Sequence, residues 1–223
     1  AHTRQRPLGG SGLQIPVLGQ GGASLGDLYS KVDNSVALAA LAMAHESGVI
    51  FFDTSPWYGV GLSEARFGVA LHGMPRASFI VQTKVGRRLV PDPKAMNGTA
   101  AGWIGGFHMG VRFDYSGLGF ERQLEDSLQR TGLGYVDSLV IHDLEPQPRA
   151  TDVSDGVSAA RADLDILRWS GFKALQQMRA SGRIKAFGAG LNSDEDGEDK
   201  ATKRAWNREY FAALLDMGKE GHG

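Results

Sequence analysis

The sequence predicts a parallel α/β fold. Five short apolar segments, rich in residues that favour strands, alternate along the chain with segments of helical periodicity. The short segments are apolar throughout and do not alternate with polar residues, which is typical of parallel strands covered on both faces. An open doubly wound sheet and a β/α barrel both fit this order. Segment 19–24 lacks the last glycine of a G-x-G-x-x-G motif, which disfavours a Rossmann nucleotide-binding fold.

The strands are predicted from apolar runs that end at turn residues. After an extended start over Leu8–Val17, whose glycines predict turns, the predicted strands are Val17–Gly19, Val49–Phe52, Phe79–Val81, Val136–Ile141 and Ile184–Phe187. Val49–Phe52 illustrates the criterion, because four apolar residues are too few for a buried helix and are rich in strand formers.

Helices are predicted between these strands from apolar residues at helical spacing. In Ser35–Glu46 the apolar stripe consists of Val36, Ala39, Ala40, Met43 and Ala44, and Gly48 ends the helix. The other predicted helices are Leu62–Leu71, Phe120–Arg130, Phe172–Ser181 and Arg208–Met217, with Arg161–Arg168 as helical surface. A strand–helix unit therefore occurs five times.

The composition excludes several classes of partner and site. In 223 residues, 24 basic and 25 acidic side chains give a formal net charge of −1, so there is no electrostatic reason to expect a nucleic acid or an anionic lipid surface. The absence of cysteine excludes disulfides, thiolate metal sites and a cysteine nucleophile, and without His-Glu-x-x-His no metal site is predicted. No apolar run approaches the roughly 18 residues of a membrane span. We expect a soluble protein of the cytoplasm or of an organellar matrix or stroma.

Three polar side chains follow predicted strands. Asp53 and His142 come directly after an apolar run, and Lys84 comes three residues after one. Each alone is more often a buried polar group or a loop residue. The carboxyl ends of parallel strands meet at one functional rim, however, so three titratable residues at successive strand ends predict a site there.

Tyr58 lies five residues after Asp53, so both side chains can reach one cleft. Tyrosine has an ordinary pKa of about 10 and is a poor proton donor near neutral pH until a cation lowers that pKa. Lys84 can supply the cation, Asp53 can balance it, and His142 can donate a hydrogen bond or relay a proton. The combination suits reduction of a carbonyl group, whose oxygen becomes an alkoxide and needs a proton.

Three segments resemble signatures of the aldo-keto reductase family. They are Phe52-Asp53-Thr54-Ser55-Pro56-Trp57-Tyr58-Gly59 with Ser63-Glu64, Val81-Gln82-Thr83-Lys84-Val85-Gly86, and Leu124-Glu125-Asp126-Ser127-Leu128 with Leu133, Asp137 and Ile141-His142-Asp143. Gly86-Arg87, Trp103 and Phe113-Asp114-Tyr115-Ser116 resemble the branch of aldose dehydrogenases (L-fucose and D-threo-aldose type) and pyridoxal dehydrogenase. The resemblance covers roughly residues 6–192, and the combined motifs are specific.

The resemblance implies a (β/α)8 barrel that uses NADP or NAD to interconvert a small carbonyl compound or sugar with its alcohol. It implies a catalytic tetrad with Tyr58 as general acid and base; the tetrad is Asp53, Tyr58, Lys84 and His142. It also implies that Gly22, Asp53 and Asn192 contact the cofactor, Asn192 at the nicotinamide carboxamide.

The expected architecture is an incomplete barrel with about five of the eight β/α units. We expect the partial barrel in residues 1–192, and an acidic loop plus a C-terminal helix in residues 193–223. The loop Ser193–Arg204 carries Asp194, Glu195, Asp196, Glu198 and Asp199. In the family, the remaining units supply most of the loops that hold the cofactor, so cofactor binding is expected to be weak or lost.

Two functions fit these observations. The intact tetrad favours an NAD(P)-dependent oxidoreductase, and the missing units favour a non-catalytic structural or assembly subunit. In either case the first and fifth strands would leave unpaired edges, and inward-facing Phe51, Val81 and Ile141 would lose cover. We therefore expect another protein chain over the open edge of the barrel.

The residues around the predicted site have two interpretations each. Trp57, Trp103 and Phe107 either line a substrate pocket or pack as loop plugs. Arg87 and Arg88 either contact a phosphate or form solvated surface, and surface is the more common outcome for such a pair. The geometry of the folded chain has to decide between them.

Overall fold

The central element is a parallel five-stranded sheet. The computed structural model describes residues 4–95, 102–146, 156–192 and 200–220. The strands lie in the order β3–β4–β5–β8–β9, with every neighbouring pair parallel, and span Gln20–Gly21, Phe51–Asp53, Ile80–Val85, Ser138–His142 and Ala186–Gly190. Four of the five predicted strands are confirmed, and each begins one or two residues later than predicted. The prediction Val17–Gly19 is wrong in position, because the strand there is β3 at Gln20–Gly21. The polar residues expected to follow strands therefore belong to them.

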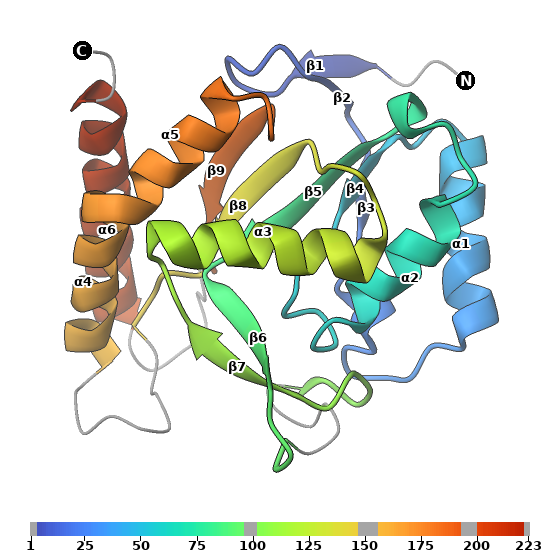
Figure 1. Cartoon of the computed structure of the whole chain (residues 1–223), viewed down its shortest axis with the longest axis horizontal. Helices are drawn as coiled ribbons and strands as arrows, with labels where there is room; N and C mark the ends of the chain where they lie inside the picture. Colours follow the sequence, from blue (N-terminus) through green and yellow to red (C-terminus); the bar gives the residue numbers. More distant parts are fainter. Residues whose placement is uncertain (1–3, 96–101, 147–155, 193–199, 221–223) are drawn as a thin grey trace.

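Helices follow the strands in the predicted alternation. They are α1 (Asn34–Glu46), α2 (Leu62–Leu71), α3 (Gly117–Thr131), α4 (Gly156–Ile166), α5 (Phe172–Ala180) and α6 (Lys200–Glu220), with short 3-10 turns at Ser24–Gly26 and Arg76–Ser78 and a π-helical turn at Leu167–Gly171. In Figure 1, α1 and α2 lie at one side of the sheet, α4 to α6 at the other, and α3 crosses in front. Within the described ranges, no helix combines the length and apolar character needed to cross a bilayer.

Two antiparallel hairpins lie at opposite ends of the sheet (Figure 1). One pairs β1 (Gln5–Pro7) with β2 (Gln14–Pro16), and the other pairs β6 (Arg87–Pro91) with β7 (Met109–Phe113). The second lies in a part of the chain for which the sequence predicted neither a strand nor a helix.

Gly86 makes the turn from β5 into β6 possible. Its φ is +112°, and a side chain there would meet the Tyr115 ring at 2.5 Å. Its N–H donates to Gln123 Oε1 at 2.7 Å. Only glycine fits this corner, so β6 leaves the carboxyl end of β5 directly.

The two faces of the sheet differ in their cover. Phe52, Val81, Leu139 and Ile141 are buried against the helices in the hydrophobic core. Because strand side chains alternate between faces, Phe51 points the other way. Of the three side chains predicted to face inward, only Phe51 does so; the prediction is wrong for Val81 and Ile141, which occupy the helix-facing register.

The face opposite the helices forms an open groove of about 570 Å³. It is lined by Leu8–Ser11 of the β1–β2 turn, by Phe51, Asp53, Gln82, Lys84, Ser138 and Val140, by Ala186–Gly190, and by Arg179. Apart from Arg179, these residues come from the sheet and the hairpin turn, so no described helix packs across this face. Helices on one face only are the arrangement of a (β/α)8 barrel, and the fold is a partial barrel of this kind.

Helix α1 is apolar on more than one side. Its core contacts come from Ala37 and Leu41, which are completely buried, whereas Val36 and Met43 are 58% and 66% exposed. The predicted stripe through Val36 and Met43 is therefore not the core face. Periodicity could not select the face, because apolar residues surround most of this helix.

Helix α6 begins earlier than predicted. It starts at Lys200 and not at Arg208, so the end of the predicted loop Ser193–Arg204 is helical. The five acidic residues of that loop lie outside the described residues. The helix joins the core through Trp206, whose Nε1–H donates to the Leu144 carbonyl at 2.7 Å.

A buried carboxylate connects α2 to α3 and β5. Glu64 is completely buried; its Oε1 accepts from Thr83 Oγ1 at 2.7 Å and its Oε2 from Arg130 Nε at 2.6 Å. One side chain therefore holds α2, α3 and β5 together near the carboxyl end of β5.

We expect Glu64→Ala to lower the free energy of unfolding by about 3–5 kcal/mol, because it leaves the Arg130 charge and the Thr83 hydroxyl without this partner. Urea denaturation followed by circular dichroism measures the change. Glu209→Ala is the matched control, since it breaks an exposed pair with Arg161 worth about 0–1 kcal/mol. Equal losses in the two variants would contradict the structural role of Glu64.

Candidate active site

Three of the predicted site residues meet at the carboxyl ends of neighbouring strands. Asp53 ends β4, Lys84 is the penultimate residue of β5, and His142 ends β8. Lys84 Nζ donates to Asp53 Oδ1 at 2.7 Å and Oδ2 at 2.8 Å, and to the Thr54 carbonyl at 3.0 Å. The lysine uses its three donors on β4 and on the loop that follows it.

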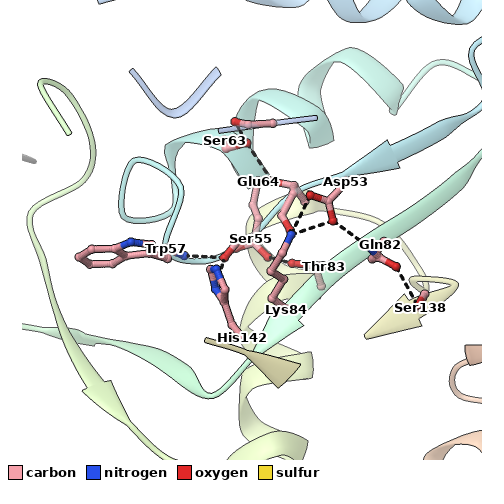
Figure 2. A network of polar contacts seen from close by, with 12 residues as sticks. Asp53, Ser55, Trp57, Ser63, Glu64, Gln82, Thr83, Lys84, Ser138 and His142 are labelled. Atoms are coloured by element: carbon pink, nitrogen blue, oxygen red, sulfur yellow. Dashed lines mark hydrogen bonds and ion pairs between the residues drawn. The ribbon is translucent and has the colours of Figure 1, made fainter. Parts of the chain in front are cut away.

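The Asp53 carboxylate is held from a second side that the sequence did not point to. Gln82 Nε2 donates to Asp53 Oδ1 at 2.8 Å, and Ser138 Oγ donates to Gln82 Oε1 at 3.2 Å. Figure 2 shows this chain of contacts running from Ser138 through Gln82 and Asp53 to Lys84. It keeps the carboxylate oriented toward the lysine.

Tyr58 lies beside both Lys84 and His142. Lys84 Nζ is 4.7 Å from the centre of the Tyr58 ring. The Tyr58 and His142 rings are perpendicular, with centres 5.8 Å apart. The convergence of Asp53, Tyr58, Lys84 and His142 expected from the sequence is therefore present in the fold.

The loop around Tyr58 is fixed by close backbone packing. A side chain on Gly26 would meet Gly59 N and the Tyr58 carbonyl carbon at 2.5 Å each. Ser63 N donates to the Tyr58 carbonyl at 3.1 Å, which ties the loop to the start of α2. Val60 has a φ of +50°, an unusual conformation for a β-branched residue. Such conformations persist only where the surroundings over-determine them.

The electrostatic balance at Tyr58 differs from the prediction. Burial raises the pKa of Tyr58 above its ordinary value; Lys84 lowers it, and Asp53 raises it again. Lys84 acts in the expected direction, but the expected net lowering of the pKa of Tyr58 is wrong, because loss of water outweighs the cation. Tyr58 is therefore protonated at neutral pH.

His142 is buried and neutral. Its Nδ1 lies 3.0 Å from Ser55 Oγ and its Nε2 lies 3.2 Å from Asp143 Oδ2. Burial, together with the Arg87 and Lys84 charges, lowers the pKa of His142 well below its usual value. The ring can donate a hydrogen bond but does not carry a charge near neutral pH.

The sequence favoured solvated surface for Arg87, and this prediction is wrong. It is buried, its Nη2 pairs with Asp143 Oδ2 at 3.0 Å, and its guanidinium carbon lies 5.1 Å from the Trp57 ring centre. Arg88 instead points to Asp126, with an N···O distance of 3.6 Å. The Gly86-Arg87 pair, one of the motifs that resemble the aldose dehydrogenase branch, is the sequence feature that could have pointed to Arg87 as a residue of the site.

Trp103 packs against both Trp57 and Tyr58, and Phe107 is not part of this ring cluster. The two indoles meet edge to face with centres 6.1 Å apart, and Trp103 is 5.8 Å from the Tyr58 ring. Trp103 is buried, and the Leu28–Trp103 bridge holds its segment. Phe107 lines a separate groove on the far side of the β6–β7 hairpin.

The two further cofactor candidates differ in their surroundings. A side chain on Gly22 would meet Ser63 Oγ at 2.6 Å and Phe67 at 2.8 Å, so this glycine packs against α2. Asn192 follows β9, and its Nδ2 lies 3.5 Å from Glu145 Oε1. Asn192 thus lies near the carboxyl ends of β8 and β9, and a cofactor contact by either residue stays a prediction.

The open groove passes beside Lys84 and Asp53. Gly188 and Gly190 form its wall on β9, and a Cβ at Gly188 would have no atom within 4 Å. Glycine therefore keeps the groove open beside the Asp53–Lys84 pair. Contact between this groove and the nicotinamide end of a cofactor stays a prediction.

Comparison with known proteins gives one family and two similar dehydrogenases. The profile of the aldo/keto reductase family matches residues 17–207. The chain is 36% identical to D-threo-aldose 1-dehydrogenase of a Pseudomonas species, over 81% of this chain and 51% of that protein. It is also 36% identical to pyridoxal 4-dehydrogenase of Microbacterium luteolum, over 85% of this chain and 56% of that protein.

Solved structures agree with the sequence relatives. A holo-form aldo-keto reductase from Bacillus halodurans superposes with a TM-score of 0.59 at 26% identity, covering 85% of this chain and 51% of that one. The chain spans about half the length of the curated relatives that it matches.

The charges around Tyr58 predict opposite effects of two substitutions. Lys84→Met removes the cation that lowers the pKa of Tyr58, so this pKa should rise further. Asp53→Asn removes the anion that raises it, so the pKa should fall. Phenolate absorbance during alkaline titration measures both, with Tyr58→Phe identifying the Tyr58 contribution. Shifts in the same direction would show that these charges do not act on Tyr58.

Proposed function

The chain belongs to the aldo/keto reductase family, whose members are NAD(P)-dependent oxidoreductases, and we propose that it interconverts a small carbonyl compound or sugar with the corresponding alcohol. The observation that carries the proposal is the position of Lys84. Its Nζ is bound to both oxygens of Asp53 and lies 4.7 Å from the Tyr58 ring centre, so a half-buried phenol is placed beside a paired cation.

Tyr58 is the proton donor in the direction of reduction. A reduced nicotinamide supplies the hydride when bound, and the carbonyl oxygen, as it gains negative charge, takes the Tyr58 hydroxyl proton. The raised pKa of Tyr58 keeps this proton in place at neutral pH. In the direction of oxidation the tyrosinate accepts the alcohol proton, so oxidation gains from higher pH.

Lys84 and Asp53 set the charge around this proton transfer. The Lys84 cation stabilises the tyrosinate that reduction leaves behind, since a positive charge within about 6 Å favours the ionised form. Asp53 orients the lysine and offsets its charge, which lowers the cost of burying it. His142, neutral and buried, donates a hydrogen bond and leaves proton transfer to Tyr58.

The substrate side is formed by aromatic residues. Trp57 is half-buried and offers flat apolar surface to a small substrate, while the buried Trp103 packs against both Trp57 and Tyr58. The relatives named for D-threo-aldose and pyridoxal support a sugar or an aromatic aldehyde as the substrate class.

NAD or NADP is the proposed cofactor, bound weakly by this chain alone. The groove beside Lys84 receives the nicotinamide end, with Asp53 and Asn192 as contacts. A dinucleotide also needs backbone N–H groups or cations placed against its phosphates, and the chain spans only about half the length of its relatives.

We also propose that another protein chain covers the open groove. Among the described residues, β3 and β9 each pair with one neighbour only, so both edges of the sheet are bare. The helices beside these edges expose apolar residues, namely Val36 and Met43 on α1 and Phe211 and Leu215 on α6. Burying a few hundred Å² of such surface contributes several kcal/mol at about 25 cal/mol per Å².

Tyr58→Phe should lower kcat for reduction by about 10²- to 10⁴-fold, because it removes the general acid and little else. The measurement follows NADH or NADPH oxidation with an aldose or pyridoxal at saturating cofactor. Tyr29→Phe is the control, since Tyr29 is 78% exposed and should leave the rate unchanged. A wild-type chain without turnover, alone and in its isolated native assembly, would favour the non-catalytic subunit.

The isolated chain should bind NADPH with an affinity weaker than micromolar, because few of its residues can contact the phosphates. Titration of NADPH fluorescence measures the affinity. A micromolar dissociation constant for the chain alone would contradict the proposal.

The chain should not be a free monomer in its working state, because the residues that the structure describes leave both sheet edges and the groove uncovered. Light scattering at low micromolar concentration measures the mass. A monomer that melts cooperatively would contradict the proposed partner.

A further inference from the structure

Arg87 has hydrogen-bonding capacity that the described part of the fold does not use. A guanidinium carries five N–H donors, and among the described residues this side chain makes one hydrogen bond, from Nη2 to Asp143 Oδ2 at 3.0 Å. Its Nε is buried and has no partner. Buried donors without a partner are rare in folded proteins, so this one calls for an explanation.

The unused donors lie around one aromatic ring. The Arg87 guanidinium carbon is 5.1 Å from the centre of the Trp57 ring, and Trp103, whose Nε1 is also buried without a partner, meets the same ring edge to face. Trp57 is half-buried, and the Arg87 side chain keeps 9% of its surface exposed. A small molecule that stacks on Trp57 therefore lies next to an arginine with donors to spare.

The Trp57 ring belongs to the proposed active site. Trp57 directly precedes Tyr58, and its N–H donates to Ser55 Oγ at 3.1 Å, which lies 3.0 Å from His142 Nδ1. Burial, and after it the Arg87 charge, lower the pKa of His142 most, so Arg87 lies close to that ring. Tyr58 serves the reacting oxygen, and the donors of Arg87 remain available to a second oxygen of the substrate.

The charges around the ring favour a neutral substrate. Arg87 pairs with Asp143 at 3.0 Å and Lys84 pairs with Asp53 at 2.7 Å, so both cations that act on His142 already face a carboxylate. An anionic substrate would have to compete with these carboxylates. A hydroxyl group needs only an N–H donor and leaves both ion pairs intact.

We propose that Arg87 determines specificity for a neutral, hydroxylated carbonyl compound, whose carbon frame lies on the Trp57 ring and whose second oxygen accepts from the Arg87 guanidinium. A site built to donate to a hydroxyl group discriminates against the analogue that lacks it, because the donor is then left unpaired. The effect on turnover rests on the proposed function. Binding of the hydroxyl group does not require turnover.

Nitrogen-15 NMR of the full-length labelled chain, with and without NADPH, tests binding apart from turnover. The Arg87 Nε–H signal is assigned by its loss in Arg87→Lys and by its cross-peaks to the Trp57 ring. The probes are the methyl glycosides of glucose, galactose and arabinose, which have no free carbonyl group. At least one should shift this signal, because the conjugated guanidinium responds to a hydrogen bond at any of its nitrogens.

Tetrahydropyran, a sugar ring without hydroxyl groups, is the matched probe and should leave the Arg87 signal in place. Absence of a shift with all of the glycosides, or equal shifts with glycosides and tetrahydropyran, would overturn the proposal. This result does not depend on whether the chain turns over any substrate.

Kinetics test specificity with glyceraldehyde and propanal, which share a carbon frame and differ in their hydroxyl groups. The wild type should have the higher kcat/KM for glyceraldehyde. Arg87→Lys keeps the charge that faces Asp143 but loses the fork of N–H donors, so the ratio of the two kcat/KM values should fall by about 10-fold, mainly through KM for glyceraldehyde. Arg88→Lys is the matched control, because Arg88 faces Asp126 and should leave the ratio unchanged.

The two possible failures can be told apart. A wild type that turns over neither aldehyde contradicts the proposed function, and the NMR titration then still decides the role of Arg87. Turnover that Tyr58→Phe abolishes, with the same ratio in Arg87→Lys as in the wild type, supports the proposed function and overturns the specificity role. Arg87→Gln provides the same comparison if Arg87→Lys fails to fold.

Discussion

The ion pair between Lys84 and Asp53 supports the rest of the site. The parallel pairing of β4 with β5 puts both side chains on the groove face, and the lysine also binds the Thr54 carbonyl at the start of the loop that carries Tyr58. Removing Asp53 would leave the buried Lys84 charge without its carboxylate partner, which costs several kcal/mol. One interaction thus connects two strands, anchors the loop and sets the charge beside the phenol.

The site is maintained against local strain. The Tyr58 loop passes Gly26 so closely that no side chain fits, and Val60 and Asp143 both adopt positive φ. Each conformation costs free energy that packing around it must offset. The same packing removes water from Tyr58 and His142, which shifts both of their pKa values toward the neutral form. Close packing therefore has an electrostatic consequence as well as a structural one.

The open groove and the site share one surface. Asp53 and Lys84 line the groove, so whatever occupies or covers it lies against the proposed reaction centre. Among the described residues, β3 and β9 are the edge strands of the sheet that carries this groove. Covering the groove would exclude water from the ion pair, and Coulomb interactions strengthen as the local dielectric falls.

The sequence alone determined the order of strands and helices, the fold class and the convergence of Asp53, Tyr58, Lys84 and His142, because apolar runs and residues at strand ends are local signals. It did not determine the buried face of α1, since apolar residues surround that helix. It did not determine the burial of Arg87 either, because no local sequence feature distinguishes an arginine in solvent from one in a buried ion pair. Only the tertiary structure decided that burial outweighs Lys84 at Tyr58 and that Asp143 meets His142. These pKa shifts and contacts depend on the distances between side chains and on the water that folding removes. No local sequence pattern specifies either the distances or the loss of water.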